Sequence, residues 1–305
     1  MTVAPTTAAD GPTARQTGFV LVGDDGTRYS RAAVDFAVEE ASRRRLPLSV
    51  VTIRRSVMVP GVSLTDQLRE ERTAVREAEH RLRSTLARVR ERHPGVLVEG
   101  VLLKDPEPSQ VTRRLDGATL LVLGRHSAFG LPAFALDSPS MELAEAVSCP
   151  VVCVPEAPAV EPPAGRQAGP VVVGVDTGDL AIRLLQQAGE EAGRRSTGLV
   201  VVHCYRVDPG EDLAQVQAGA RAAVQELVLR ARLDPGVDVT IDLTSAPAAA
   251  ALVERTREAS LLVTGTRGLL ALAGLTMGSV SRGVLDAAAC PVLVVLERVQ
   301  RPVHA

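Results

Sequence analysis

The residues with the clearest chemical potential are glycines and serines near the C-terminal end of the chain. Gly265 and Gly268 are followed, after nine intervening residues, by Gly278 and Ser279, and Ser281 comes two positions later. Glycine lets backbone amides approach a polyanion without a Cβ clash, and a glycine–serine pair at the start of a helix presents free amides and hydroxyls. This spacing predicts a loop that binds the phosphates of a nucleotide.

An acidic residue in the same half of the chain adds to this pattern. Asp176 lies two positions after Gly174, at the end of an apolar run, where a carboxylate in a nucleotide-binding fold accepts hydrogen bonds from ribose or base. Single features have simpler explanations, since glycines also turn tight loops and Gly278-Ser279 would serve as a plain helix cap. Each contact at a helix terminus contributes only about 0.3–1 kcal/mol, so several must converge. The combination favours a nucleotide site.

The elements that would position these residues occur twice along the chain. Residues 120–155 align without a gap with residues 261–296, and residues 19–27 correspond to residues 170–178. The segment between the two copies is rich in Pro and Ala, which is typical of an extended linker. We therefore expect a disordered tail at 1–17, a first domain at 18–155, a linker at 156–169 and a second domain at 170–298.

Short apolar runs alternate with longer segments of helical period in both halves, which is typical of βαβ units. The sequence predicts strands near 18–23, 47–53, 96–102, 119–123, 150–154, 170–175, 198–205, 237–243, 260–264 and 291–296. It predicts helices near 28–45, 65–92, 107–116, 138–147, 179–195, 211–233, 247–259 and 279–288. The predicted fold class is α/β, with two tandem doubly wound, five-stranded parallel-sheet domains of the Rossmann-like type. Such sheets bind ligands beyond the carboxyl ends of their strands.

The first half departs from the glycine pattern of the second. Ser127 stands at the place of Gly268, and Asp137 stands at the place of Gly278. A carboxylate at a helix N-cap occupies the amides that a phosphate would need and repels its charge. The positions that keep the pattern are Gly23, Asp25, Gly124 and Ser138. We therefore expect a degenerate nucleotide site in the first domain.

The motif Gly265-x2-Gly268-x9-Gly278-Ser279, with Asp176 and the segment SVSRGVLDAAACPVLVV, resembles the ATP-binding pattern of the universal stress protein family. The resemblance covers nearly the whole chain outside the tail and linker, as a tandem two-domain member. It implies the strand order 3-2-1-4-5 and ATP, with or without Mg²⁺, between the ends of strands one and four. The implied nucleotide contacts are Gly174, Asp176, Cys204, Thr264, Gly265, Arg267, Gly268, Gly278, Ser279, Val280 and Ser281.

The resemblance also bears on partners and function. It implies that Val151–Val154 and Val292–Val295 pair, and the linker length favours pairing within one chain, with a homodimer left open. It implies a regulatory or signalling module of the stress response that acts on an unidentified protein partner and is not an enzyme. Two alternatives stay open. One is a slow ATPase or nucleotidyl-transfer enzyme, although the chain lacks a Walker lysine, and the other is an interaction scaffold that binds no nucleotide.

Charge and composition argue against several other classes. The chain has 34 Lys plus Arg against 36 Asp plus Glu, so no global basic field would attract nucleic acid or a membrane surface. The arginines at 43–45 are interpreted as part of a solvated helix face. No apolar run has the length of a membrane helix, and the first residues lack a signal-peptide pattern, so we expect a cytoplasmic protein.

The cysteines and histidines show no catalytic or metal-binding spacing. Cys149, Cys153, Cys204 and Cys290 form no CxxC pair, so we expect reduced thiols and no metal site. His126 and His203 stand without a carboxylate or cysteine at useful spacing, and both are interpreted as satisfied or solvated side chains.

Overall fold

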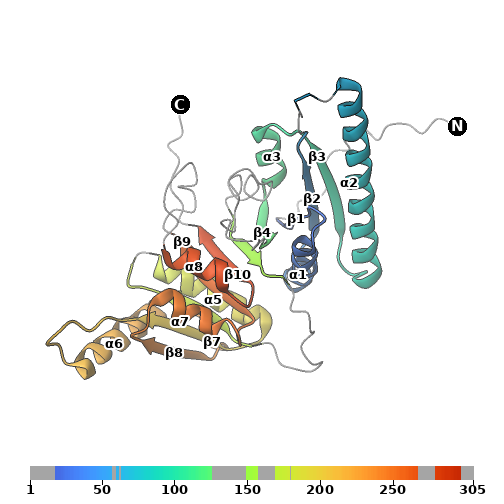
Figure 1. Cartoon of the computed structure of the whole chain (residues 1–305). Helices are drawn as coiled ribbons and strands as arrows, with labels where there is room; N and C mark the ends of the chain where they lie inside the picture. Colours follow the sequence, from blue (N-terminus) through green and yellow to red (C-terminus); the bar gives the residue numbers. More distant parts are fainter. Residues whose placement is uncertain are drawn as a thin grey trace, which may run out of the picture.

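The computed structural model describes residues 18–56, 60–61, 63–125, 149–156, 169–178, 180–266 and 279–296. The first half contains β1 (Phe19–Gly23), α1 (Arg28–Arg44), β2 (Leu48–Arg54), α2 (Leu64–Arg92), β3 (Val98–Lys104), α3 (Pro108–Leu115), β4 (Ala118–Gly124) and β5 (Val151–Val154). The second half contains β6 (Val171–Val175), α5 (Ala181–Arg195), β7 (Leu199–Cys204), α6 (Leu213–Ala231), β8 (Val239–Thr244), α7 (Ala248–Arg255), β9 (Leu261–Thr266), α8 (Ser279–Ala287) and β10 (Val292–Leu296). Strands and helices alternate along most of both halves (Figure 1).

The ten strands found among the described residues join in a single sheet, in the order β3-β2-β1-β4-β5-β10-β9-β6-β7-β8. Within each half neighbouring strands pair in parallel, as β1 does with β2 and with β4. β5 and β10 pair in antiparallel register, with Cys153 opposite Val292 and Val151 opposite Val294. Each half therefore has the order implied by the family resemblance, and the two fifth strands meet within this chain.

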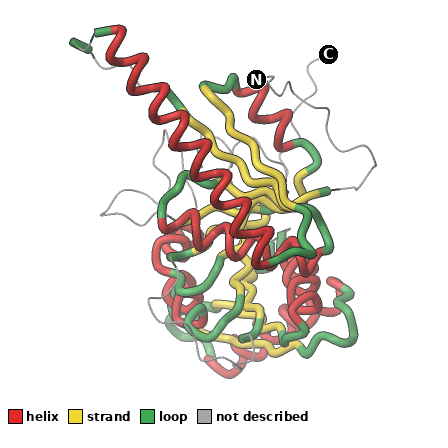
Figure 2. The backbone as a smooth tube through the Cα atoms, turned by 90° about the vertical axis from the view of Figure 1, so that its right-hand side faces the viewer, coloured by secondary structure: helices red, strands yellow, loops and turns green. Residues whose placement is uncertain are grey.

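Helices cover both faces of this sheet. Val20 and Val22 of β1 belong to a hydrophobic cluster that also contains residues of α1, α2, α5 and α6. Leu21 between them belongs to a second cluster, with residues of α3, α7 and α8. Successive side chains of a strand point to opposite faces, so two clusters on alternate residues mean that both faces are buried. Figure 2 shows the strands running between helices, and the predicted α/β class is confirmed.

The predicted elements differ from the observed ones mainly at their ends. β3 begins two residues after the strand predicted near 96–102, and the helix predicted near 138–147 lies outside the described residues. The helix predicted near 247–259 is α7, which ends at Arg255. Thr256 Oγ1 donates to Val253 O at 2.5 Å and accepts from the Ala289 amide at 2.9 Å. This threonine ties the end of α7 to the turn before β10, so the helix stops there.

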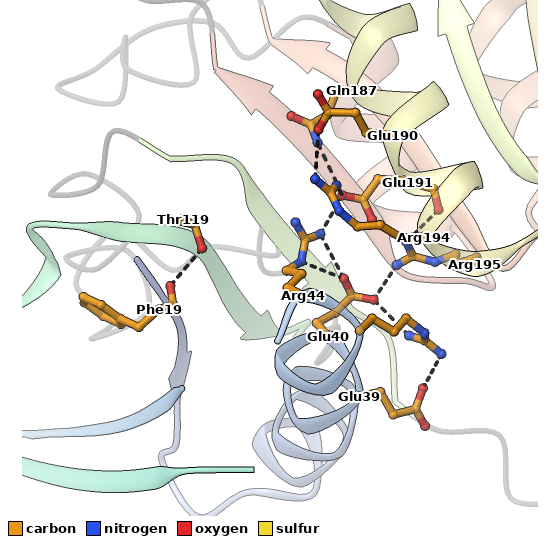
Figure 3. Close-up of polar contacts among 11 residues, drawn as sticks. Phe19, Glu39, Glu40, Arg44, Thr119, Gln187, Glu190, Glu191, Arg194 and Arg195 are labelled. Carbon is orange, nitrogen blue, oxygen red and sulfur yellow. Dashed lines mark hydrogen bonds and ion pairs between the residues drawn. The ribbon is translucent and has the colours of Figure 1, made fainter. Parts of the chain in front are cut away.

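A buried group of four charged residues joins the two halves where α1 and α5 meet. This interdomain charge cluster consists of Glu40 and Arg44 of α1 and Glu191 and Arg195 of α5, and both glutamates have 0% exposure. Arg44 donates to Glu191 at 2.5 Å, and Arg195 donates to Glu40 at 2.5 Å. Each arginine also pairs with the glutamate one turn earlier in its own helix (Figure 3). Both halves therefore contribute one carboxylate and one guanidinium to a reciprocal contact.

The interpretation of the arginines at 43–45 as a solvated face is wrong for Arg44, whose side chain is only 9% exposed. Residues four apart on a helix share a face, so the Arg44 side chain lies beside Glu40 and faces α5. An isolated charge would be costly to bury, but here every charge has at least two partners of opposite sign. A partner from the other domain was not visible in the local sequence.

Candidate functional site

The predicted site lies where β6 and β9 separate. The two strands pair as far as Val173 and Val263. Beyond these residues β6 continues beside β7, with Val175 opposite His203, and β9 continues beside β10 as far as Thr266. Neighbouring strands that part at their carboxyl ends form the place where open α/β sheets bind ligands. Four predicted site residues fall at this place, namely Gly174, Asp176, Thr264 and Gly265.

The two glycines at the strand ends lie directly under leucine side chains of the covering elements. A Cβ on Gly265 would lie 2.3 Å from Leu180 Cδ2, and a Cβ on Gly174 would lie 2.8 Å from Leu252 Cδ1. Leu180 directly precedes α5 and Leu252 belongs to α7, so elements from both faces of the sheet approach the strand ends. The sequence pointed to ligand access, and close packing is a second reason for glycine at these positions.

Asp176 lies exposed at the carboxyl end of β6. Its Oδ1 accepts a hydrogen bond from the Gly178 amide at 2.9 Å, which orients the side chain over the turn that leads into α5. Thr264 of β9 is buried, with 5% exposure. The Asp176 carboxylate is therefore accessible to a ligand, whereas the Thr264 side chain is buried in the protein interior.

The first turn of α8 is tied to the end of β9. Ser281 is 7% exposed, and its Oγ donates to the Gly265 carbonyl at 3.0 Å. A hydroxyl has a single proton, so the Ser281 hydroxyl can donate only to this carbonyl. The hydrogen bond positions the start of α8. Val280 is half-buried and packs against the cluster on the α7 face. The remaining predicted residues of the loop, Arg267, Gly268 and Gly278, lie outside the described residues, as do Ser127, Asp137 and Ser138 of the first half.

The end of β7 lies beside the end of β6, next to the predicted site. His203 Nδ1 lies 3.0 Å from the Val175 carbonyl. A carbonyl can only accept, so Nδ1 carries the proton, and the imidazole links the ends of β6 and β7. Cys204 follows it and is half-buried, and burial raises the pKa of its thiol against the opposing charge of Arg255. The interpretation of His203 as a satisfied histidine agrees with this contact.

The corresponding place in the first half is filled by an aspartate that sequence reasoning missed. Asp24, which stands where the second half has Val175, is 7% exposed. It accepts hydrogen bonds from the Gly26 amide at 3.0 Å, Ser30 Oγ at 2.9 Å and Thr85 Oγ1 at 3.0 Å. Two adjacent acids after a strand were the available signal, because alternation must send one of them inward.

Gly124 and Asp25 also lie at the strand ends of the first half. A Cβ on Gly124 would lie 2.5 Å from the carbonyl carbon of Tyr29, so the start of α1 presses directly on the end of β4. Asp25 accepts from the amide and the hydroxyl of Thr27, at 2.9 and 2.7 Å. Asp25 therefore makes the same kind of local contact as Asp176 of the second half, and the first half differs by the buried Asp24 beside it.

All four cysteines are free thiols. Burial raises the pKa of Cys149 to about 11 and the pKa values of Cys153 and Cys290 to about 12. Across the described ranges, no three or more His, Cys, Asp or Glu side chains gather as a metal site would require. Within the same part of the chain, every helix is too short or too polar to cross a membrane.

Comparison with known proteins agrees with the fold and the repeat. The sequence profile of the Universal stress protein family matches residues 19–155 and again residues 168–295. A universal stress protein of Mycobacterium tuberculosis is 31% identical over 292 residues, which cover 90% of this chain and 96% of the relative. A second one from the same species is 30% identical, with 91% and 96% covered.

A solved structure gives the same architecture over nearly the whole chain. A universal stress protein from Archaeoglobus fulgidus aligns over 94% of this chain and 98% of its own, with a TM-score of 0.62 and 16% identity. A universal stress protein solved in complex with cAMP is 31% identical and aligns over 42% of this chain and 98% of its own, with a TM-score of 0.34. With two matches of one family profile over both halves, this chain belongs to the universal stress protein family.

Proposed function

We propose that the second domain, residues 170–298, binds ATP where β6 and β9 separate. The observation that carries this proposal is the meeting of three features at one point: the parting strands, the exposed Asp176 carboxylate, and α8 held against β9 by the Ser281–Gly265 hydrogen bond. The residues proposed to form the site are Gly174, Asp176, Cys204, Thr264, Gly265, Arg267, Gly268, Gly278, Ser279, Val280 and Ser281, with Thr264 and Ser281 as buried supports of the strand end and the helix start.

Each part of this site would supply a different kind of contact. The amides at the start of α8 and the glycine loop before it would bind the phosphates, because a helix N-terminus carries unpaired donors and partial positive charge. Asp176 would accept hydrogen bonds from the ribose, and the backbone at Cys204 would meet the base. Mg²⁺ would accompany the phosphates as counter-ion.

The first domain, residues 18–155, is proposed to bind no nucleotide. Asp24 places a carboxylate at the strand end, where it would repel phosphate, and its hydrogen bonds to Ser30 and Thr85 hold the start of α1 and α2 across this region. The proposed output of the protein is therefore regulatory. ATP occupancy of the second domain would change how the chain meets a protein partner in the cytoplasm during the stress response, without turnover of the nucleotide.

The test is calorimetric titration of the full chain with ATP and Mg²⁺. We expect one ATP per chain for the wild type. The variant Gly278→Asp copies Asp137 of the first half and should weaken ATP binding by at least roughly 30-fold, because it adds repulsion where the phosphates lie. The control Gly219→Asp adds the same charge on the exposed face of α6, where nothing lies within 4 Å of the new Cβ, and should bind like the wild type.

Two results would contradict the proposal. Absence of binding heat for the wild type would leave an interaction scaffold without nucleotide, and equal affinity of the wild type and Gly278→Asp would move the site elsewhere. Release of ADP during the titration, followed by chromatography, would favour the alternative of a slow ATPase.

A further inference from the structure

A side chain of the first domain holds a helix of the second. Arg125 directly follows β4, and its backbone amide donates to Val154 O at 2.7 Å. Its Nη1 donates to the carbonyls of Leu285 at 3.0 Å and Ala288 at 2.7 Å. Both carbonyls lie at the C-terminal end of α8, so Arg125 caps this helix from the other domain.

The chemistry of the contact suits a helix terminus. The last carbonyls of a helix have no partner within it and carry partial negative charge, and a cation there forms charge-assisted hydrogen bonds. Arg125 Nε is buried and has no hydrogen-bond partner among the described residues, so its two bonds to α8 are what hold the guanidinium in place.

The sequence of the second half does not repeat this arginine. In the aligned repeat, Thr266 occupies the position of Arg125, and a threonine has neither the length nor the charge for this contact. The first domain therefore supports α8 through a residue that the second domain does not repeat at that position.

Both ends of α8 are fixed, by different domains. Ser281 ties the first turn to Gly265 of β9, and Arg125 ties the last turn to the end of β4. α8 is short, with a length of about 13 Å at 1.5 Å per residue, so a shift at one end moves the other. We propose that Arg125 is a positioning residue for the nucleotide site of the second domain, an inference that rests on the proposed function of that domain.

The first domain would then have a role in ATP affinity although it is itself proposed to bind no nucleotide. The variant Arg125→Met keeps an unbranched apolar side chain in place of the aliphatic part of arginine and removes the charge and the donors. ATP affinity of the full chain should fall about tenfold, because the helix end that faces the phosphates loses its fixed position. Adenosine, which has no phosphates, should bind the variant as it binds the wild type. The control Arg113→Met removes an exposed arginine of α3 and should change neither affinity.

Calorimetry with ATP and with adenosine separates the outcomes. Unchanged ATP affinity in Arg125→Met overturns the inference and leaves the proposed function standing. Equal weakening of ATP and adenosine also overturns it, since it indicates general damage to the domain. Failure of the wild type to bind ATP removes the proposed function and the inference with it. If Arg125→Met does not fold, Arg125→Lys carries the same test, with an ATP affinity expected between those of Met and Arg.

Discussion

Replacing Glu191 with glutamine should strongly destabilise the chain. Glu191 is fully buried and accepts from Arg44 at 2.5 Å, from Arg194 at 2.9 Å and from Arg195. Glutamine has nearly the same shape but carries no charge, and its amide group turns a donor toward guanidinium groups that also donate. Arg44 and Arg195, at 9% and 4% exposure, would then share the single carboxylate of Glu40. Breaking a buried ion pair in this way costs about 3–5 kcal/mol.

Chemical denaturation followed by circular dichroism measures this cost. The matched control is Glu190→Gln, one residue away on the same helix, whose side chain is 59% exposed and pairs with Arg194 at 3.0 Å. Exposed pairs contribute about 0–1 kcal/mol, so the control should unfold nearly as the wild type does. A Glu191→Gln protein that lies within 1 kcal/mol of its control would refute our account of the interdomain charge cluster.

The destabilisation caused by Glu191→Gln should also depend on pH. Burial raises the pKa of Glu191, but Arg44, Arg195 and Arg194 outweigh it, and the net pKa lies below the ordinary value of 4.5. A carboxylate with a depressed folded-state pKa stabilises the fold above its unfolded pKa and loses this contribution as the pH falls through the folded value. The difference in unfolding free energy between wild type and Glu191→Gln should therefore be constant above about pH 5.5 and shrink below about pH 4.5. A difference that grows toward acid pH would contradict this sign.

Two further predictions concern the strand ends and the thiols. Gly124→Ala should cost about 1–3 kcal/mol in thermal unfolding, because its Cβ would lie 2.5 Å from backbone carbon of Tyr29, whereas Gly95→Ala, with nothing within 4 Å, should be tolerated. A native protein titrated with a thiol reagent at pH 8 should show at most one accessible cysteine, Cys204, since the other three are buried with strongly raised pKa values. Reaction of any thiol in native Cys204→Ser would contradict this ranking.

The fold could be read from the sequence because its determinants are local or repeated. Apolar runs between helical segments located every described strand to within a few residues, and the repeat alignment singled out the segments that became β5 and β10. The antiparallel register that joins them depends on a contact between segments more than 130 positions apart. The family resemblance implied that these two strands pair, and the antiparallel direction came from the structure.

The site was predictable in outline and not in its supporting contacts. Asp176 and Gly265 fall at the strand ends as expected, because strand order and alternation place them there. The roles of Ser281, Asp24 and Arg125 emerged only from the structure, since each depends on a partner from another element or domain. Charge spacing within α1 gave no indication that Arg44 would be buried, because the group that neutralises it lies in α5.

Because β5 and β10 pair within one chain, the contact between the two halves does not depend on protein concentration. Sixteen residues connect Val154 to Val171, so each half meets the other at an effective concentration on the order of millimolar, whatever the amount of protein in solution. Two separate chains joined along the same strands would come apart as their concentration dropped. The tandem arrangement keeps Arg125 beside α8 even when the protein is scarce, as at the onset of expression.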